Sequence, residues 1–538
     1  MHKFSTAAHV AALLSGGSLL AWGVTSQVAR ADEEFLRPDT LVISSSAYDS
    51  SRGAVASLKV GTVLPNSATA TTKAISDNNY VTVWNNDSVD ASFGVTSPIR
   101  LTVVQPETGH ALRSITVPTE QVVTSFPSKS EIGLHLSKNR EGLHLVFVGY
   151  SSPGVGALDA SNADAAAGQD PTNPVTFAFG SSYAFSRTIV SMDEQGRFVY
   201  TPTINYGGNN GRAALLGSNG LYYTVGNANN GNAATFGPNG TSPDVTETTG
   251  LEVVKPINSW HAGATIPAGN SAEVDPLIQY PLGKNGALDK AGKDNNYRGL
   301  TEFGGALYFT KGSGSNGMDT VYTVSTLPTV ANAVAQKITV VSGFPTDSAR
   351  ATGGNFTPFA VFFANSSTMY VADEGTGSTL DATRHAGLQK WSLVNGTWQL
   401  DYVLTDGLIG KVDGNLFGYD GQYPDVTTSG LRNLAGVVNH NGTVTLWATT
   451  ATTSASGDNG ADPNKVVTIV DDLAATTLTG GVAQESFRTI VGPTYGTVYR
   501  GVAYVPRESD RDFGDHDGDD RGDHGRDHDG DGHSGGDR

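Results

Sequence analysis

Arg500-Gly501-Val502-Ala503-Tyr504-Val505 is a short, mostly apolar segment led by an arginine, and its composition predicts a β-strand. Earlier segments of the same kind are each followed by a second strand, but no such strand follows this last one. Residues 41–46, near the other end of the chain, can supply the missing partner. We therefore predict that the first and last strands pair within one sheet, because a ring of repeats closed in this way protects its sheet edges.

The earlier arginine-led segments share the layout of the last one. They begin at Arg212, Arg298 and Arg432, and each ends a few residues before the next strand begins. The corresponding segment at residues 355–361 has no arginine in that place, so the element is not universal. If these segments are the innermost strands of their sheets, the four arginines, Arg500 included, converge near one rim of a central channel.

A longer repeat contains these segments: an apolar strand that often starts Leu-Tyr or Met-Tyr, a glycine-rich loop and a second apolar strand. Convincing helical periodicity is nearly absent from the chain. We count seven copies of the repeat, two of them degenerate. Their strand pairs lie at residues 41–43 with 55–58, 99–101 with 114–117, 143–148 with 188–190, 220–223 with 250–254, 306–309 with 320–322, 368–371 with 387–391, and 444–447 with 465–469.

These repeats predict an all-β fold, a seven-bladed β-propeller that spans residues 40–506 and is closed by the pairing of the N- and C-terminal strands. The better copies are roughly 60 to 85 residues apart, beyond the usual propeller repeat of about 40 to 50, so the blades must carry long loops. Two packed β-sandwich domains are the alternative. The chain has no cysteine, which excludes a disulfide framework, a thiolate metal site and a cysteine nucleophile.

The N-terminus has the pattern of a secretory signal peptide. Lys3 gives a positive flank, an apolar stretch follows, and small residues up to Ala31 precede three acidic ones. We expect residues 1–31 to be removed and the mature chain to be secreted, either extracellular or periplasmic. The apolar stretch is too short for a membrane anchor, and no later segment is long and apolar enough for a transmembrane helix.

The charge of the chain is unevenly distributed. The formal net charge of -18 argues against nucleic acid as a partner, because binding to phosphates needs a basic surface. Residues 508–538 carry twelve acids and four arginines, a net charge of -8, and we expect residues 507–538 to form a disordered Asp/His/Gly-rich tail.

The tail contains one metal candidate. Asp527, Asp529 and Asp531 match the opening of a calcium loop, but Arg538 stands at the twelfth position, where a glutamate is required. We therefore expect weak binding of a divalent cation at most, and no other cofactor. A purely solubilising tail is the alternative.

Several stretches resemble a family of bacterial secreted propeller-like repeat proteins. They include Tyr370-Val371-Ala372-Asp373, Leu446-Trp447-Ala448-Thr449-Thr450, and Phe487-Arg488-Thr489 with the final arginine-led strand. The resemblance covers most of residues 40–506 and implies a propeller fold and secretion. That family has no settled activity, so the resemblance implies no catalytic residue.

The recurring arginines are the main candidates for ligand binding. A guanidinium is a planar, permanently charged fork that suits carboxylate, sulfate or phosphate groups. Arg212, Arg298, Arg432 and Arg500 would then form an anion site on an otherwise acidic protein. The alternative is that each arginine makes structural hydrogen bonds to a neighbouring blade, and the repetition itself favours that alternative.

Three loop residues are further candidates. Trp260 and His261 open a long loop, where an aromatic ring beside an imidazole could stack on and hydrogen-bond a sugar, and His385 is a similar case. The alternative is an ordinary loop position, which is the usual explanation for a single aromatic–histidine pair in a loop. We find no metal-ligating histidine spacing and no nucleophile or phosphate-loop motif in a fitting context, so we assign no catalytic residue.

We predict an extracellular recognition protein that binds an anionic or glycan ligand on a β-propeller. Two alternatives stay open. One is a secreted lyase or hydrolase that acts on an acidic polysaccharide, with the arginines neutralising substrate carboxylates. The other is a structural or adhesive surface protein whose tail gathers metal. The sequence does not decide whether the protein is an enzyme.

Overall fold

A computed structural model describes most of residues 34–507. Within these residues the regular structure is β, apart from α1 (Tyr80–Val83) and short 3-10 segments such as η1 (Val55–Ser57). The predicted signal peptide and residues 508–538 lie outside the described part. The internal gaps are residues 65–72, 90–92, 129–130, 140, 152–153, 159–185, 204, 207–209, 228–248, 263, 265, 268, 276–294, 313–316, 347–355, 376–385, 419–422, 454–458 and 479–484.

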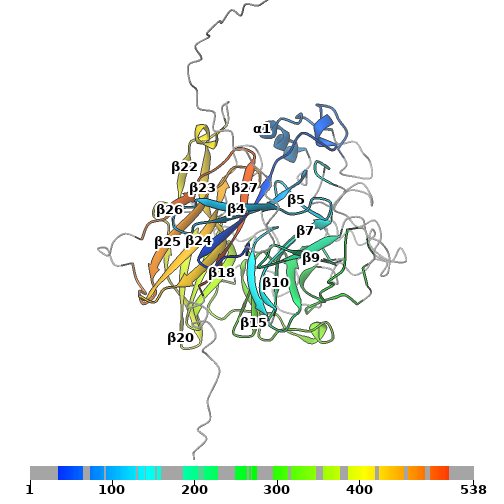
Figure 1. Ribbon diagram of the computed structural model, residues 1–538. Helices are drawn as coiled ribbons and strands as arrows, with labels where there is room; N and C mark the ends of the chain where they lie inside the picture. Colours follow the sequence, from blue (N-terminus) through cyan, green and yellow to red (C-terminus); the bar gives the residue numbers. More distant parts are fainter. Residues whose placement is uncertain are drawn as a thin grey trace, which may run out of the picture. The chain divides into compact units, whose positions relative to one another are not determined.

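The described strands form six antiparallel sheets, which are the blades of a propeller-like architecture (Figure 1). We number the blades from the sheet that contains the first strand. Blade 1 has the strand order β27 (Thr497–Val505), β1 (Thr40–Ala47), β3 (Ile99–Val104) and β4 (Ala111–Thr116). Blade 2 has β2 (Thr96–Ser97), β5 (Val122–Ser125), β7 (Gly142–Ser151), β8 (Arg187–Asp193) and β9 (Phe198–Thr203), with β6 (His135–Asn139) paired to β7.

The other four blades follow the chain in order. Blade 3 consists of β10 (Gly211–Leu216), β11 (Tyr222–Gly226), β12 (Gly250–Val254) and β13 (Ser271–Glu273). Blade 4 consists of β14 (Leu300–Phe303), β15 (Ala306–Lys311), β16 (Thr320–Val324) and β17 (Thr339–Val340). Blade 5 consists of β18 (Pro358–Asn365), β19 (Thr368–Asp373), β20 (Gly387–Val394) and β21 (Thr397–Leu404). Blade 6 consists of β22 (Gly410–Val412), β23 (Val426–Val438), β24 (Thr443–Thr453), β25 (Val466–Asp472) and β26 (Arg488–Val491).

Blade 1 combines strands from both ends of the described chain. β1 pairs antiparallel with β27, from Thr40 opposite Val505 to Ala47 opposite Thr497. The other side of β1 pairs with β3. The sequence predicts this pairing of β1 with β27, because no strand follows the arginine-led segment at residues 500–505.

The hydrophobic core is divided among the interfaces between blades. One buried apolar cluster joins each pair of successive blades from blade 1 to blade 6, and a further cluster joins blade 6 to blade 1. Six strands, one from each blade, contact one another in the same succession, and we call them the inner strands: β27, β6, β10, β14, β18 and β23.

A strand between two such clusters must be apolar on both faces. In β1, Val42 belongs to the cluster shared with blade 2, whereas Leu41 and Ile43 belong to the cluster shared with blade 6. Successive side chains of a strand point to opposite faces, so an uninterrupted apolar run fills both interfaces. This explains why the repeats contain continuous runs such as residues 41–43 rather than alternating polar and apolar residues.

The number of blades differs from our prediction of seven because two of the expected units share one sheet. Residues 41–43 and 99–101 lie in β1 and β3, where Leu41 is opposite Val104. Residues 55–58, expected to be a strand, include the 3-10 segment η1 instead. The predicted pair of residues 99–101 with 114–117 is found in β3 and β4, and the other five predicted pairs are likewise each found side by side in one blade. Sheets joined in this single succession do not form the two sandwich domains of the alternative.

Glycines next to the arginines allow the inner strands to approach closely. A Cβ atom on Gly299 would lie 2.1 Å from the carbonyl oxygen of Phe359, and one on Gly501 would lie 2.4 Å from the amide nitrogen of Leu134. Real Cβ atoms do not come this close to backbone atoms. Contact between two main chains, rather than a left-handed backbone conformation, therefore explains glycine at these two positions.

Candidate functional site

The four predicted arginines lie on or beside inner strands of four different blades. Arg212 is in β10, Arg298 directly precedes β14, Arg432 is in β23 and Arg500 is in β27. All four are buried, with 2 to 8% of their surface exposed. The condition set in the sequence analysis is thus met in that each arginine lies on or beside one of the inner strands.

The arginines are close enough to influence one another electrostatically. Burial, followed by the charge of Arg298, lowers the pKa of Arg212 to about 9. Burial also lowers the pKa of Arg298, and the charge of Arg432 adds to that effect while Glu374 opposes it. Like charges brought together in a buried place repel one another, and a bound anion would relieve this repulsion.

Arg432 and Arg500 bond to groups of other parts of the fold, and the Arg298 guanidinium carbon lies 6.0 Å from the centre of the Phe359 ring in blade 5. Arg432 Nε lies 3.1 Å from Glu374 Oε2, at the end of β19 in blade 5. Arg500 donates hydrogen bonds to the carbonyl oxygen of Phe126, next to β5, and at 3.1 Å to that of Gly460. For these two residues the structure thus supports the structural alternative left open in the sequence.

Acidic residues that the sequence did not single out lie among the arginines. Glu131 is buried and accepts a hydrogen bond from the Tyr150 hydroxyl. Burial raises the pKa of Glu131, although the Tyr150 hydrogen bond and the charges of Arg212 and Arg500 act in the opposite direction. Asp319 accepts from Lys311 at 2.8 Å. The centre of the inner strands is therefore a mixed cluster of buried cations and carboxyl groups.

The loop candidates lie apart from this pattern. Trp260 is buried, and its indole nitrogen donates to the carbonyl oxygen of Ala264 at 3.1 Å. His261 is exposed, and its Nδ1 lies 3.2 Å from the carbonyl oxygen of the next residue. Both side chains thus bond to their own loop. His385 and the tail residues Asp527, Asp529 and Asp531 lie outside the described residues.

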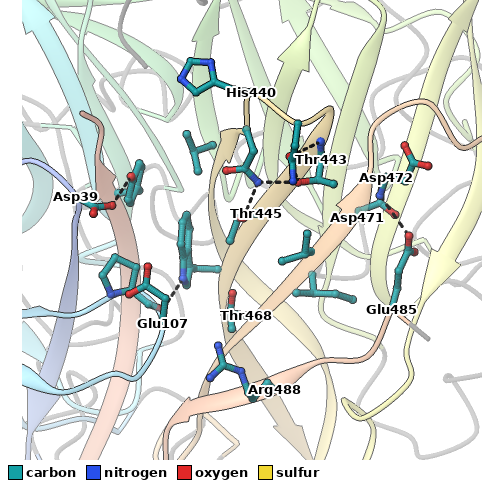
Figure 2. Close-up of a pocket in the computed structure, with 18 of the residues that line it drawn as sticks. Asp39, Glu107, His440, Thr443, Thr445, Thr468, Asp471, Asp472, Glu485 and Arg488 are labelled. Carbon is teal, nitrogen blue, oxygen red and sulfur yellow. Dashed lines mark hydrogen bonds between the residues drawn. The ribbon is translucent and has the colours of Figure 1, made fainter. Parts of the chain in front are cut away.

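A cleft of about 820 Å³ opens between blade 6 and blade 1 (Figure 2). Its walls come from the ends of β23, β24, β25 and β26 on one side and from β27 and the segments around residues 39 and 106 on the other. The lining residues used below are Asp39, Glu107, Thr443, Thr445, Trp447, Val470, Asp471, Asp472, Glu485, Arg488, Tyr504 and Arg507.

Asp471 is held at one side of the cleft by three donors from blade 5. The hydroxyl groups of Tyr370 and Tyr402 donate to its carboxylate at 2.5 and 2.7 Å, and Lys390 Nζ lies 2.9 Å from Oδ2. Lys390 is itself buried and also lies over the Tyr402 ring, 5.3 Å from its centre. The Asp471 side chain is therefore buried and held in place by two hydrogen bonds and an ion pair from blade 5.

Glu485 lies beside Asp471, and its pKa differs strongly from that of an ordinary glutamate. Burial, the hydrogen bond with Asp471 and the negative charge of that carboxylate raise the pKa of Glu485 to about 7. The amide nitrogen of Asp472 donates to Glu485 Oε1 at 3.2 Å, as Figure 2 shows. Glu485 thus exchanges its proton near neutral pH, which suits a group that binds or transfers protons.

We expect a Glu485→Gln variant to lose part of the pH dependence of stability. The folded-state pKa of Glu485 is raised, so the folded protein holds a proton that the unfolded chain releases above about pH 4.5. The resulting loss of unfolding free energy grows as the pH rises from about 4.5 to about 7, and it is complete above about pH 7. Glutamine removes the effect, so the variant should gain about 1 kcal/mol relative to the wild type at pH 8, after allowance for solvent screening.

Urea unfolding at pH 5 and pH 8 measures this difference. The matched control is Glu194→Gln, because Glu194 accepts a backbone hydrogen bond from Leu143 but has no carboxylate partner of this kind among the described residues. The account is contradicted if the stability difference between Glu485→Gln and the wild type is the same at both pH values.

Comparisons with known proteins show only a general likeness. No protein-family model matches the chain, and no curated protein matches it. Among solved structures it is similar to an ACO/RPE65 chimera (7% identity, TM-score 0.32, 77% of this chain and 71% of that chain). It is also similar to a GH43_1 enzyme from Xanthomonas citri complexed with xylose (12%, 0.29, 58% and 83%). A third similar structure is a quinonprotein alcohol dehydrogenase-like protein from Bacteroides thetaiotaomicron (9%, 0.28, 77% and 85%).

These identities and TM-scores are low, so the activities of those proteins are not carried over to this chain. Two further findings concern the described residues alone. They contain no helix that is both long and apolar enough to cross a membrane. They also contain no group of three histidine or acidic side chains placed to hold a metal ion.

Proposed function

We propose that this chain is an extracellular recognition protein whose inner-strand arginines bind carboxylate or sulfate groups of an acidic glycan. The observation that supports the proposal is that buried guanidinium groups from different blades lie near one another: besides burial, the charge of Arg298 lowers the pKa of Arg212, and the charge of Arg432 lowers that of Arg298. A buried cation that is repelled by its neighbours gains more from an anionic ligand than an exposed arginine would gain.

The proposal includes a closed ring of six blades. Its support is that β23 contacts β27 and β27 contacts β6, so the succession of inner strands returns to its beginning. The pairing of β1 with β27 would then fasten the ring. Export by the signal peptide at residues 1–31, and a tail that gathers divalent ions weakly, also belong to the proposal.

Arg212 and Arg298 are the two arginines that we assign to the ligand. They are the most exposed of the four, at 6 and 8%, and burial, with a further contribution from a neighbouring arginine, lowers the pKa of each. Arg432 and Arg500 are held by Glu374 and by backbone carbonyls, and we assign them to the scaffold. The site is thus a pair of planar donors supported by two structural arginines.

An Arg298→Ala variant should bind acidic glycans roughly tenfold to a hundredfold more weakly than the wild type. The loss of one charge-assisted contact costs about 1.5–3 kcal/mol, which corresponds to that range. Isothermal titration with glucuronate oligosaccharides and with sulfated disaccharides measures the effect. Arg298→Lys, which keeps the charge but not the fork, should show an intermediate loss.

The matched control is Arg197→Ala, since Arg197 is an exposed arginine in a surface ion pair with Asp193. It should bind as the wild type does. Thermal unfolding of each variant separates lost binding from lost folding. Wild-type affinity in a folded Arg298→Ala variant, or no affinity of the wild type for any of these acidic sugars, would refute the proposal.

A further inference from the structure

The cleft between blades 6 and 1 exists because one face of β24 changes from apolar to polar along its length. Val444 and Leu446 of this strand pack in the cluster with blade 5. On the opposite face, Trp447 packs with residues of blade 1, but Thr443 and Thr445 come before it and line the cleft. Threonine hydroxyls do not fill an apolar interface, so the two blades separate at this end.

The wall formed by blade 6 combines hydroxyl and amide groups with a small apolar surface. Asn439 Nδ2 donates to the hydroxyl oxygens of Thr443 and Thr445, at 2.9 Å each (Figure 2). Val470 stands opposite Thr445 in the neighbouring strand and is 50% exposed. Hydrogen-bonding groups are thus fixed beside an accessible apolar side chain.

Where the two walls meet, one aromatic ring from each blade forms an equally fixed pair. The Tyr504 ring is stacked on Trp447, with ring centres 4.8 Å apart and planes 14° apart. The Tyr504 hydroxyl donates to Asp39 at 3.0 Å, and the Trp447 indole nitrogen donates to the carbonyl oxygen of Pro106 at 2.9 Å. Held at both ends, the two rings need little reordering when a ligand enters, which lowers the entropic cost of binding.

Internal pairing offsets much of the charge in the cleft. Asp39 pairs with Arg507, and Asp471 pairs with Lys390. Glu485 is half-protonated near neutral pH, because its pKa is about 7. Arg488 also lines the cleft, beside the remaining acids Glu107 and Asp472, so the lining has no excess of positive charge and does not suit the acidic ligand that we assign to the arginines.

We propose that this cleft is a second binding site, for an uncharged, hydroxyl-rich ligand of the neutral oligosaccharide class. Sugars combine hydroxyl groups with apolar ring faces, and the cleft offers the complement: carboxyl, hydroxyl and amide groups beside aromatic and aliphatic carbon. Glu485 is well placed to take part, because a carboxyl group can donate to a sugar hydroxyl when protonated and accept from one when ionised.

A substitution that fills the cleft tests this site without disturbing the core. Val470→Arg places a long side chain among the cleft walls at a position that is already half exposed. The matched control is Val334→Arg, because Val334 is also an exposed valine, at 61%, in a 3-10 segment of a different part of the fold. Both variants gain the same charge and volume, so only the location differs.

The measurement is titration of the full chain with glucose hexasaccharides of α-1,4 and β-1,4 linkage and with the N-acetylglucosamine hexamer. We expect the wild type and Val334→Arg to bind at least one of them equally, and Val470→Arg to bind it at least tenfold more weakly. Arg298→Ala should bind it as the wild type does, which separates this site from the proposed acidic-glycan site.

Three results would overturn the inference. One is unchanged binding by Val470→Arg when that variant is folded. Another is the absence of binding by the wild type to all three neutral sugars. The third is tighter binding of a cationic glucosamine hexamer than of the neutral ones, because the cleft would then select positive charge.

Discussion

A Lys390→Gln variant is expected to lose about 3–5 kcal/mol of unfolding free energy. The Lys390 ammonium is 1% exposed and lies 2.9 Å from Asp471, whose side chain is fully buried. Without the lysine, Asp471 would keep its two tyrosine donors but would be a buried carboxylate with no cation beside it. This lysine comes from blade 5 and the carboxylate from blade 6, so its loss weakens the interface between the two blades.

Guanidinium chloride unfolding, followed by tryptophan fluorescence, measures the loss. Lys411→Gln is the matched control, because Lys411 makes an ion pair with Asp425 in which both side chains are exposed, and this variant should show no measurable change. Equal stability of the two variants would contradict the conclusion that the Lys390–Asp471 pair joins the blades.

A Gly501→Ala variant should be destabilised by about 3 kcal/mol, at the upper end of the cost of overpacking. The added Cβ would lie 2.4 Å from the Leu134 amide nitrogen and 2.7 Å from the Ile132 carbonyl oxygen. Both contacts are backbone atoms of the segment that leads into β6, so neither can be relieved by a side-chain rotation. The two inner strands must separate, and the cluster between blades 1 and 2 loosens with them.

Gly492→Ala provides the control for this change. No atom lies within 4 Å of a Cβ built there, and its backbone is not in the left-handed region, so alanine should be neutral or slightly stabilising. Thermal unfolding of both variants makes the comparison. A Gly501→Ala protein as stable as Gly492→Ala would show that β27 and the residues before β6 are not in contact.

Much of the fold could be predicted because each copy of the repeat has a recognisable local amino-acid composition. Apolar runs such as residues 41–43 fill two interfaces at once and stand out from the glycine-rich loops around them. The count of seven blades is not confirmed by the described residues, and it departs from the structure where composition is ambiguous. Residues 55–58 are as apolar as a short strand, but Val55 and Leu58 pack in a cluster with Tyr80 and Trp84 rather than in a sheet.

The candidate sites were predictable only in part, because repetition in the sequence marks some of their residues and not others. The arginines recur at equivalent strand positions, so repetition reveals them without any knowledge of their contacts. Glu131 and Asp319 lie outside the strands, and no periodicity marks them. The group of Tyr370, Lys390 and Asp471 joins two blades across about a hundred residues of sequence, and no spacing rule connects such distant positions.

The central claim is that Arg212 and Arg298 hold an anion among the inner strands. A crystal structure of the protein grown with selenate, with data collected at the selenium absorption edge, tests it most directly. The account predicts an anomalous peak within about 4 Å of guanidinium nitrogens of both arginines, because a selenate oxygen at hydrogen-bond distance lies between each nitrogen and the selenium. Selenate found only at surface lysines and arginines, with no peak beside these two residues, would contradict it.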